Sequence, residues 1–451
     1  MSTSAHPASH RVHWPRRWVV WFLVGLAASA GIGVGIDRAF SSGQPRYSWP
    51  PEPCVVEGLD ARCGTFVVPE NRAKPNGRTI GLHVVVLPAQ SKPVRKDAVA
   101  YLAGGPGSAA TDNAADRSRQ LTLLSTNHDI LLVDQRGTGR SKRHNADVTQ
   151  YGTRMAMDDL DSIRAALGYR QLAVIGSSYG ATAAQVYLKL HPASGHTLIL
   201  AAGTAIDVPF FGRYAVNAQR ALDQLAKSCA SQPNCREAFP DWERQFGELV
   251  KAWNAHPMHG MSGDEFASVV HAMLLDLQKA VSIPLVVSRA AAGDYAPLKH
   301  AGSGDLPFTI GLMSSIWCNE PWVGLDSTGP WGTEFDSYAT AQIAAVRHQC
   351  SSVAKRAEPR ALWRLPASSR VPVLALVGGA DPQDPVTNLS NLKQHFPNSR
   401  TVVFPQIGHE FNIGGCVDEM MADLVDRGTT RRLDTTRCEG AVVVPPFPLS
   451  D

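Results

Sequence analysis

Residues 172–190 read LAVIGSSYGATAAQVYLKL, and this stretch decides the fold. Leu172–Ile175 is a short apolar run typical of a buried strand, and Ala181–Leu190 has the composition of a helix. Between them, residues 176–180 (GSSYG) have the form G-x-S-x-G. A strand, a tight glycine turn and a helix in this order raise the central serine above the edge of a sheet. The pattern predicts that Ser178 is a nucleophile, and a structural turn rich in serine and glycine is the alternative.

A serine hydroxyl is a weak nucleophile until a base takes its proton, and an acid must orient that base. In a sheet of this kind the acid and then the histidine follow the serine, each just after a later strand. Asp381 follows the apolar run Val371–Val377, and His409 follows Thr401–Phe404. We therefore predict a catalytic triad of Ser178, Asp381 and His409.

Two other residues compete for these roles. Asp384 lies close behind Asp381 and remains an alternative acid, although Asp381 is nearer to the end of the strand. His395 is the other histidine of the C-terminal region, but it lies inside a stretch that we expect to be helical. His409 is therefore favoured over His395 as the base.

A second glycine-rich turn, residues 103–107 (AGGPG), follows the strand-like run Ala98–Leu102. Acyl transfer places negative charge on an oxygen, which backbone N–H groups stabilise in an oxyanion hole. The N–H of Tyr179, directly after the serine, and the N–H of Gly105 are the predicted donors. A purely structural turn is the alternative for this segment, because Gly-Pro is common in turns.

Strand-like and helix-like segments alternate along the first half of the chain. Continuous apolar runs are expected of strands that are buried on both faces of a parallel sheet. Further strands are predicted at Thr65–Pro69, Ile80–Leu87, Ile130–Val133 and Leu198–Leu200, and a helix at Asp158–Leu167. The alternation predicts an α/β fold with a mostly parallel sheet.

This alternation stops between residues 205 and 370, where the segments are mostly helical. The expected helices are Asn217–Lys227, Trp242–Trp253, Glu265–Val281 and Thr340–Lys355. A stretch this long cannot be a loop, so we predict an inserted helical lid at 205–370. The core would then consist of two parts, 54–204 and 371–451.

The N-terminus has the features of an export signal. Arg16 and Arg17 precede the apolar run Trp18–Ala30, whose last residues, 28–30 (ASA), offer a cleavage site. We predict a signal peptide at 1–36, or a membrane anchor if it stays uncleaved, followed by a Pro- and Ser-rich linker at 37–53. The paired arginines also permit a twin-arginine route. In either case the remainder of the chain would be secreted or anchored at the cell surface.

Eight cysteines agree with an exported protein. Pairing each with its nearest neighbour is the simplest of the possible disulfide schemes, and disulfides persist in oxidising compartments. The spacing is not that of a zinc site, so we expect no metal and no cofactor. The net charge of +3 comes without a basic block, which gives no indication of a nucleic-acid partner. The cysteines are Cys54, Cys63, Cys229, Cys235, Cys318, Cys350, Cys416 and Cys438.

Taken together, these motifs resemble the prolyl and tripeptidyl aminopeptidase family of α/β-hydrolases. The resemblance rests on residues 104–107 (GGPG), 134–137 (DQRG) and 176–181 (GSSYGA), and on the segments around Asp381 and His409. The tail from Cys416 to Cys438 resembles the disulfide-closed end of secreted actinobacterial tripeptidyl aminopeptidases. The likeness covers nearly the whole chain after the linker but is thin across residues 205–307.

The resemblance implies an α/β-hydrolase fold with a lid and an exopeptidase that acts on free N-termini. Ala103 stands where the family often has histidine, which leaves the backbone donor of the next turn intact. Asp134 and Arg136 would be structural residues that brace the serine turn.

An exopeptidase of this kind must bind the substrate's free ammonium group, so it needs an acidic residue near the site. Residues 316–322 (IWCNEPW) resemble the family's lid segment that carries such an acid, which makes Glu320 the candidate. A solvated glutamate beside a disulfide is the alternative.

Three hypotheses follow. The leading one is an exported serine aminopeptidase that releases residues or short peptides from free N-termini through an acyl-enzyme. The second is an extracellular esterase or amidase with the same triad. The third is a surface protein that keeps the fold only for binding, which an intact triad disfavours.

Overall fold

The computed structural model describes residues 48–92, 95–143, 145–298, 309–366, 368–410 and 414–450. The predicted signal or anchor segment, 1–36, and most of the predicted linker, 37–53, lie outside the described residues. Within the described ranges, no helix combines the length and the apolar character needed to cross a bilayer.

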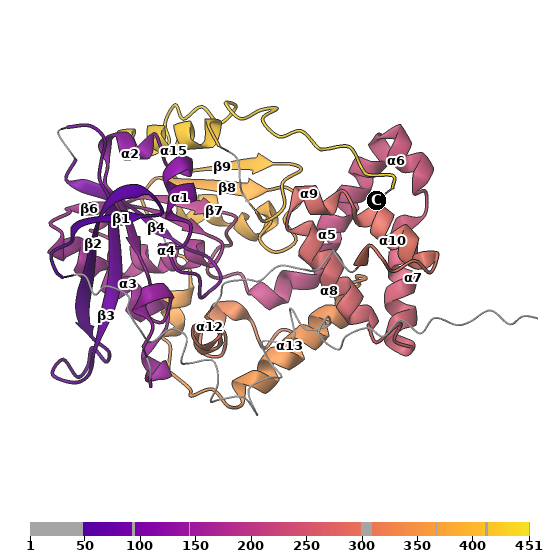
Figure 1. The fold of residues 1–451 in the computed structure, drawn as a ribbon, viewed down its shortest axis with the longest axis horizontal. Helices are drawn as coiled ribbons and strands as arrows, with labels where there is room; N and C mark the ends of the chain where they lie inside the picture. Colours follow the sequence, from indigo (N-terminus) through magenta and orange to yellow (C-terminus); the bar gives the residue numbers. More distant parts are fainter. Residues whose placement is uncertain are drawn as a thin grey trace, which may run out of the picture.

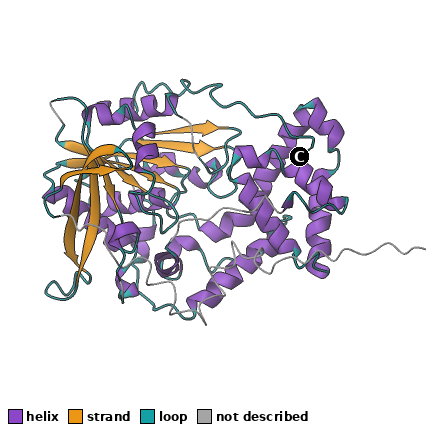
Figure 2. Ribbon diagram, in the orientation of Figure 1, coloured by secondary structure: helices purple, strands orange, loops and turns teal. Residues whose placement is uncertain are grey.

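A nine-stranded sheet, in the order β1-β2-β3-β5-β4-β6-β7-β8-β9, lies at the centre of the fold (Figures 1 and 2). The antiparallel part consists of β1 (Glu52–Val56), β2 (Leu59–Pro69) and β3 (Thr79–Leu87), and β3 pairs antiparallel with β5. The parallel part consists of β4 (Asp97–Leu102), β5 (Ile130–Val133), β6 (Gln171–Ser177), β7 (Gly195–Ala201), β8 (Val373–Gly378) and β9 (Ser399–Phe404). The predicted α/β fold with a mostly parallel sheet is confirmed.

The central strands of this sheet are buried on both faces, which explains their continuous hydrophobic runs. On β6, Leu172 and Val174 belong to one core layer, while Ala173 and Ile175 belong to the other. Helices α3 (Thr153–Ala166), α4 (Tyr179–Leu190) and α14 (Leu392–His395) contribute to the first layer. Helices α1 (Ala114–Gln120), α2 (Leu124–Asn127) and α15 (Cys416–Arg427) contribute to the second layer, and Figure 1 shows α2 and α15 along the same side.

A separate group of helices lies between the end of β7 and the start of β8, and we call residues 205–370 the lid (Figure 1). It has its own core, in which Phe246 packs against Phe266 and Phe335. Its helices are α5 (Phe210–Ser231), α6 (Pro233–Ala238), α7 (Trp242–Ala255), α8 (Gly263–Leu274), α9 (Leu277–Ala280), α10 (Ile283–Ala291), α12 (Ile310–Trp317) and α13 (Asp336–Cys350).

Short 3₁₀ turns complete the described structure. They are η1 (Gly139–Ser141), η2 (Val148–Gln150), η3 (Pro321–Val323), η4 (Arg360–Trp363) and η5 (Val386–Leu389).

Some predicted boundaries are wrong, and the helix expected at Thr340–Lys355 lies at Asp336–Cys350. The single helix expected at Glu265–Val281 is broken into α8 and α9, because the Asp276 side chain accepts the N–H of Gln278 and caps a new helix. The predicted linker extends too far, because its last residues, from Glu52 onward, form β1 and pair with β2.

Four disulfides join neighbouring cysteines, as the simplest scheme predicted. Two of them lie within the lid, where one links α5 to α6 and the other joins the end of α12 to the end of α13. The pairs are Cys54–Cys63, Cys229–Cys235, Cys318–Cys350 and Cys416–Cys438.

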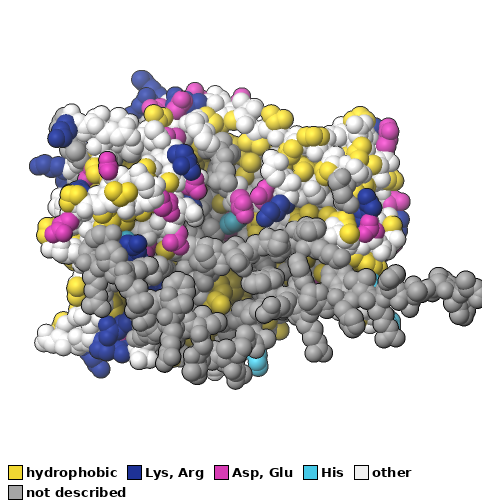
Figure 3. Space-filling model, in the orientation of Figure 1, with side chains coloured by type: hydrophobic (Ala, Val, Ile, Leu, Met, Phe, Trp, Pro, Cys, Tyr) yellow, Lys and Arg dark blue, Asp and Glu magenta, His cyan; other side chains and the backbone are white. Residues whose placement is uncertain are grey.

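On the face drawn in Figure 3, Lys and Arg occur together with Asp and Glu over both the sheet side and the lid side. This distribution agrees with the small net charge of the chain, +3.

Candidate active site

Ser178 stands at the junction of β6 and α4, with φ 55° and ψ −124°. A positive φ is strained for a residue with a Cβ and must be held by its surroundings. The neighbouring glycines explain how the turn fits. A Cβ on Gly176 would lie 2.1 Å from the carbonyl oxygen of Gly180, and one on Gly180 would lie 2.1 Å from that of Leu102. The Ser178 N–H donates to Ala201 at the end of β7, 2.9 Å away, so the turn is fastened to the sheet.

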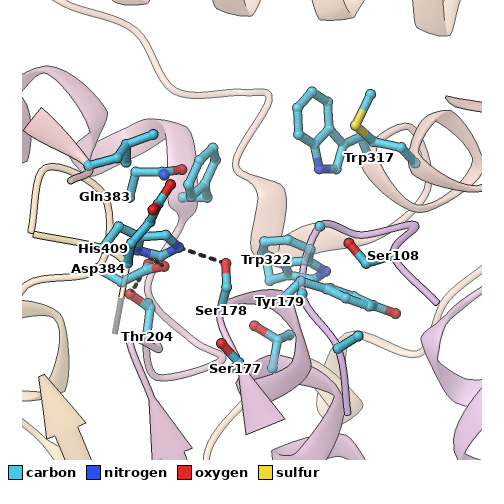
Figure 4. A pocket seen from close by; sticks show the side chains of 18 of the residues that line it. Ser108, Ser177, Ser178, Tyr179, Thr204, Trp317, Trp322, Gln383, Asp384 and His409 are labelled. Carbon is cyan, nitrogen blue, oxygen red and sulfur yellow. Dashed lines mark hydrogen bonds and ion pairs between the residues drawn. The ribbon is translucent and has the colours of Figure 1, made fainter. Parts of the chain in front are cut away.

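The structure brings the three residues of the predicted triad into hydrogen-bond contact. Nε2 of His409 lies 2.9 Å from Oγ of Ser178, and Nδ1 of His409 lies 2.9 Å from Oδ2 of Asp381. Figure 4 shows the His409 ring pointing at the Ser178 hydroxyl. With the Nδ1–H donated to the carboxylate, Nε2 is free to accept the serine proton.

The electrostatics of this group are dominated by burial and by opposite charge. Burial lowers the pKa of His409, but Asp381, Asp384 and Glu410 outweigh it and raise that pKa to about 9. Burial by itself would raise the pKa of Asp381. The charge of His409 and the backbone N–H groups of Gln383 and Asp384 bring it below its usual range instead.

Of the two competitors, only Asp384 is near the triad. Its Oδ2 lies 3.8 Å from Nδ1 of His409, and its Oδ1 accepts the hydroxyl of Thr204 at 2.5 Å (Figure 4). Burial raises the pKa of Asp384 to about 6. His395 lies at the end of α14, where its Nδ1 is 2.6 Å from the carbonyl oxygen of Pro366. The geometry favours Asp381 as the acid and His409 as the base.

Contacts from the lid hold the loops that carry Asp381 and His409. Arg220 on α5 donates to the carbonyl oxygens of Gly379 (2.6 Å) and Asp381 (3.1 Å). The carbonyl of Leu275, at the break between α8 and α9, accepts the N–H of His409 at 2.8 Å and of the next residue at 2.9 Å. The interruption of the predicted long helix therefore provides an acceptor for the histidine loop.

The glycine-rich turn at 103–107 lies directly beside Ser178. A Cβ on Gly104 would lie 3.1 Å from Cβ of Ser178, which is closer than an ordinary contact, so glycine lets the turn lie tightly against Ser178. Gly105 has a φ of 113°, a conformation that glycine adopts readily and other residues do not. Both Gly105 and Tyr179, the predicted oxyanion donors, line the same cavity as Ser178.

The DQRG segment is structural, but it supports other parts of the core than the serine turn itself. Asp134 accepts hydrogen bonds from the backbone and hydroxyl of Thr111 and from the backbone of Arg140, which holds the loop after the glycine-rich turn. Arg136 is fully buried, and its guanidinium forms a two-point pair with Asp159 on α3.

A cavity of about 550 Å³ opens onto the triad between the sheet and the lid. Its walls are largely apolar, and much of the lining comes from lid residues. Phe210, Phe211, Tyr214, Trp317 and Trp322 supply aromatic surface, and the charged lining residues among those described are Asp112, Arg117, Asp384, His409 and Glu410. Trp317 and Trp322 belong to the segment 316–322 that the sequence singled out for Glu320, whereas no local motif marks Phe210, Phe211 and Tyr214.

The interpretation of Glu320 as the ammonium-binding residue has to be corrected. Its side chain is buried, with 4% of the residue exposed, and it is absent from the lining of the cavity. Its oxygens accept hydrogen bonds from the backbone and hydroxyl of Thr153 and from the indole of Trp322, and Arg356 pairs with it at 3.3 Å. The carboxylate is therefore neutralised and fully hydrogen-bonded inside the protein.

Two family models match the chain. Residues 98–228 match the α/β hydrolase fold, and residues 336–438 match a family described as TAP-like protein.

Curated relatives include proline iminopeptidases. That of Xylella fastidiosa (strain 9a5c) is 36% identical over 107 residues, which is 23% of this chain and 31% of the relative. That of Heyndrickxia coagulans is 26% identical over 159 residues, or 35% of this chain and 52% of the relative. The chain thus matches between about a third and a half of the length of these relatives.

Among solved structures, the proline iminopeptidase of Mycobacterium smegmatis is 15% identical, with a TM-score of 0.41, and the match covers 84% of this chain and 96% of that one.

The chain is a hydrolase by its family. The α/β hydrolase model covers the strand and turn of Ser178, and the TAP-like model covers the segments of Asp381 and His409. The curated relatives that match parts of the chain include proline iminopeptidases, which agrees with these two models. These matches agree with the motifs and with the succession of strands and helices along the chain, and they support an α/β-hydrolase of the prolyl and tripeptidyl aminopeptidase type.

Proposed function

We propose that this hydrolase is an exported serine aminopeptidase that releases residues or short peptides through an acyl-enzyme. Ser178 attacks the carbonyl carbon of the scissile bond while Nε2 of His409 takes the serine proton. The protonated imidazole then gives that proton to the leaving amine, and water releases the acyl group in a second, equivalent step. The unbroken hydrogen-bond chain from Ser178 through His409 to Asp381, with two contacts of 2.9 Å, is the observation that carries the proposal.

Stabilisation of the developing oxyanion is assigned to two backbone donors. The N–H of Tyr179 belongs to the first turn of α4, where N–H groups have no acceptor within the helix. The N–H of Gly105 would approach from the opposite turn, which the missing side chain of Gly104 allows to lie against Ser178. Donors that are already in place need no reorganisation when the charge forms, so this term supplies much of the rate enhancement.

The free N-terminus of the substrate requires a negative charge within the cavity. Since Glu320 is buried and hydrogen-bonded away from the cavity, we assign this role to the carboxylates that line the cavity, Asp112, Asp384 and Glu410. A volume of about 550 Å³ suits a short peptide, and the apolar walls suit hydrophobic side chains.

Export is supported by the cysteines. All eight form disulfides, which persist outside the reducing cytoplasm. Together with the basic and apolar N-terminus, they support a secreted or surface-anchored protein.

The second candidate is an extracellular esterase or amidase with the same triad. The absence of Glu320 from the cavity lining favours this second candidate, because the predicted ammonium ligand is then missing and the walls are mostly apolar.

One experiment separates these functions. Peptide p-nitroanilides with one, two or three residues are compared with their N-acetylated forms, and labelling by a fluorophosphonate is measured in parallel. An aminopeptidase should strongly prefer the free amine, and Ser178→Ala should abolish both labelling and turnover. Equal rates for free and acetylated substrates would point to the esterase or amidase, and an unlabelled wild-type protein to a binding function.

A further inference from the structure

Glu320 receives hydrogen bonds from two sides of the molecule. Oε1 accepts the backbone N–H of Thr153 at 2.8 Å, and Oε2 accepts the hydroxyl of Thr153 at 2.7 Å. Oε2 also accepts the indole N–H of Trp322 at 2.9 Å, while Arg356 lies 3.3 Å from Oε1. Thr153 begins α3 in the core, whereas the other two partners belong to the lid, so the carboxylate joins the two parts.

The first side of this network leads to the nucleophile turn. Oγ1 of Thr153 lies 2.8 Å from the hydroxyl of Tyr179. A hydroxyl has one proton, and Thr153 donates its own to Glu320, so it must accept the proton of Tyr179. Tyr179 follows Ser178 and is one of the two oxyanion donors of the proposed mechanism. Its side chain is therefore anchored to the Glu320 carboxylate through one intervening hydroxyl.

The second side leads to the wall of the cavity. The indole of Trp322 lines the cavity, and its ring centroid is 6.0 Å from that of Tyr179. Its N–H donates to the same oxygen, Oε2, that accepts the hydroxyl of Thr153. One carboxylate thus orients an oxyanion residue and a residue of the substrate pocket, both of which appear beside Ser178 in Figure 4.

Arg356 and the segment that carries Glu320 are themselves fixed by further contacts. Arg356 donates to the carbonyl oxygen of Tyr151 at 2.9 Å and pairs with Glu358. Two residues before Glu320, the Cys318–Cys350 disulfide closes the end of α12 onto α13. Burial raises the pKa of Glu320 to about 7, although four donors surround it.

A buried ion pair of this kind is weak evidence for stability, because the loss of solvation offsets much of the attraction. We propose that Glu320 is instead a positioning residue that fixes Tyr179 through Thr153 and fixes Trp322 directly. The inference rests on the proposed serine mechanism and adds to it a link from the lid to the oxyanion hole. Displacement of Tyr179 would misplace its N–H relative to the oxyanion, whereas displacement of Trp322 would alter substrate binding.

The two branches can be separated by substitution in the full chain. Thr153→Val keeps the shape of the side chain but removes the hydroxyl that links Tyr179 to Glu320. It should lower kcat and the rate of fluorophosphonate labelling about tenfold with little change in KM, because a displaced oxyanion donor costs less than a deleted one. Thr153→Ser keeps the hydroxyl and should restore both rates. Trp322→Phe removes the indole N–H, and it should raise KM severalfold while kcat stays within about twofold.

The carboxylate that joins the two branches is tested by Glu320→Gln. An amide has one acceptor oxygen, so its NH₂ group must face donors on one side, and we expect kcat to fall and KM to rise together. Glu248→Gln, at an exposed position of α7 where the carboxylate pairs only with Arg244 among the described contacts, is the matched control and should keep both constants.

Circular dichroism and thermal melting show whether each variant folds. If Glu320→Gln does not fold, the kinetics of Thr153→Val test the inference. A folded Thr153→Val protein with wild-type kcat and wild-type labelling would overturn the inference and leave the serine mechanism standing. Wild-type labelling without peptide hydrolysis would instead contradict the proposed aminopeptidase, while the labelling rates would still test the link.

Discussion

Oδ2 of Asp384 lies 3.8 Å from Nδ1 of His409, beside the 2.9 Å contact that Asp381 makes with the same nitrogen. The single N–H at Nδ1 is directed at Asp381, so Asp384 acts on the imidazole through its charge. Its own hydrogen bond comes from Thr204. The two carboxylates near this histidine therefore have different roles, and their substitutions should differ in effect.

Removal of the orienting acid should be far more damaging than removal of the second carboxylate. Asp381→Asn should lower kcat about 10⁴-fold, because an amide can stabilise the wrong tautomer of His409. Asp384→Asn should lower kcat less than about tenfold, since the short contact between Asp381 and Nδ1 of His409 stays intact. Steady-state kinetics with a peptide p-nitroanilide measure both. A greater loss in Asp384→Asn than in Asp381→Asn would reverse the assignment of the acid.

The acidic limb of the pH profile, on which activity rises as His409 loses its proton, should have an unusually high midpoint. Only neutral His409 can accept the serine proton, and its pKa is raised to about 9 by Asp381, Asp384 and Glu410 against the opposing effect of burial. Activity should therefore rise with pH well above the ordinary histidine range, with the midpoint of the limb displaced from about 6.5 toward 9.

The same profile tests the contribution of Asp384. Asp384→Asn removes one raising charge and should move the midpoint to lower pH by up to about one unit. Asp116→Asn, at an exposed position on α1, should leave the profile unchanged. Profiles of kcat/KM against pH for the three proteins decide this, and an unshifted limb in Asp384→Asn would exclude the electrostatic role.

The close approach at the nucleophile turn should make Gly180 irreplaceable. A Cβ there would lie 2.1 Å from the carbonyl oxygen of Leu102, which is backbone and cannot move aside. Gly180→Ala should reduce the free energy of unfolding by more than about 4 kcal/mol or prevent folding. Gly414→Ala, where no atom lies within 4 Å, should change it by less than about 1 kcal/mol. Urea unfolding measures both, and a stable Gly180→Ala protein would rule out the tight contact with β4.

Loss of the lid disulfides should follow the size of the loop that each closes. Cys318–Cys350 spans 32 positions and Cys229–Cys235 spans 6. Replacement of the first pair by serines should lower the free energy of unfolding by ~3–4 kcal/mol and of the second by ~2 kcal/mol, because longer loops restrict the unfolded chain more. Chemical denaturation of the two double variants measures the difference. Equal losses would mean that strain or residual structure outweighs chain entropy.

Much of the fold follows from local patterns. Strands buried on both faces read as continuous apolar runs, so Ile130–Val133 was predicted with its observed boundaries. Antiparallel β1 is not predicted, because Glu52–Val56 is short, contains Pro53 and directly follows two prolines. The single helix predicted at Glu265–Val281 failed because the capping side chain of Asp276 outweighs helical periodicity.

The sequence by itself determined the alternation of strands and helices along the chain, and it placed Ser178, Asp381 and His409 just after predicted strands. In a parallel sheet the ends of successive strands meet at one edge, so residues 231 positions apart in the chain are brought together by regular structure alone. Only the tertiary structure decided the role of Glu320. Its partners include Thr153, 167 positions away, and the choice between an open cavity and a buried network depends on how the lid packs against the core. Local residue types do not encode that packing, because burial and hydrogen-bond partners are properties of the assembled surfaces.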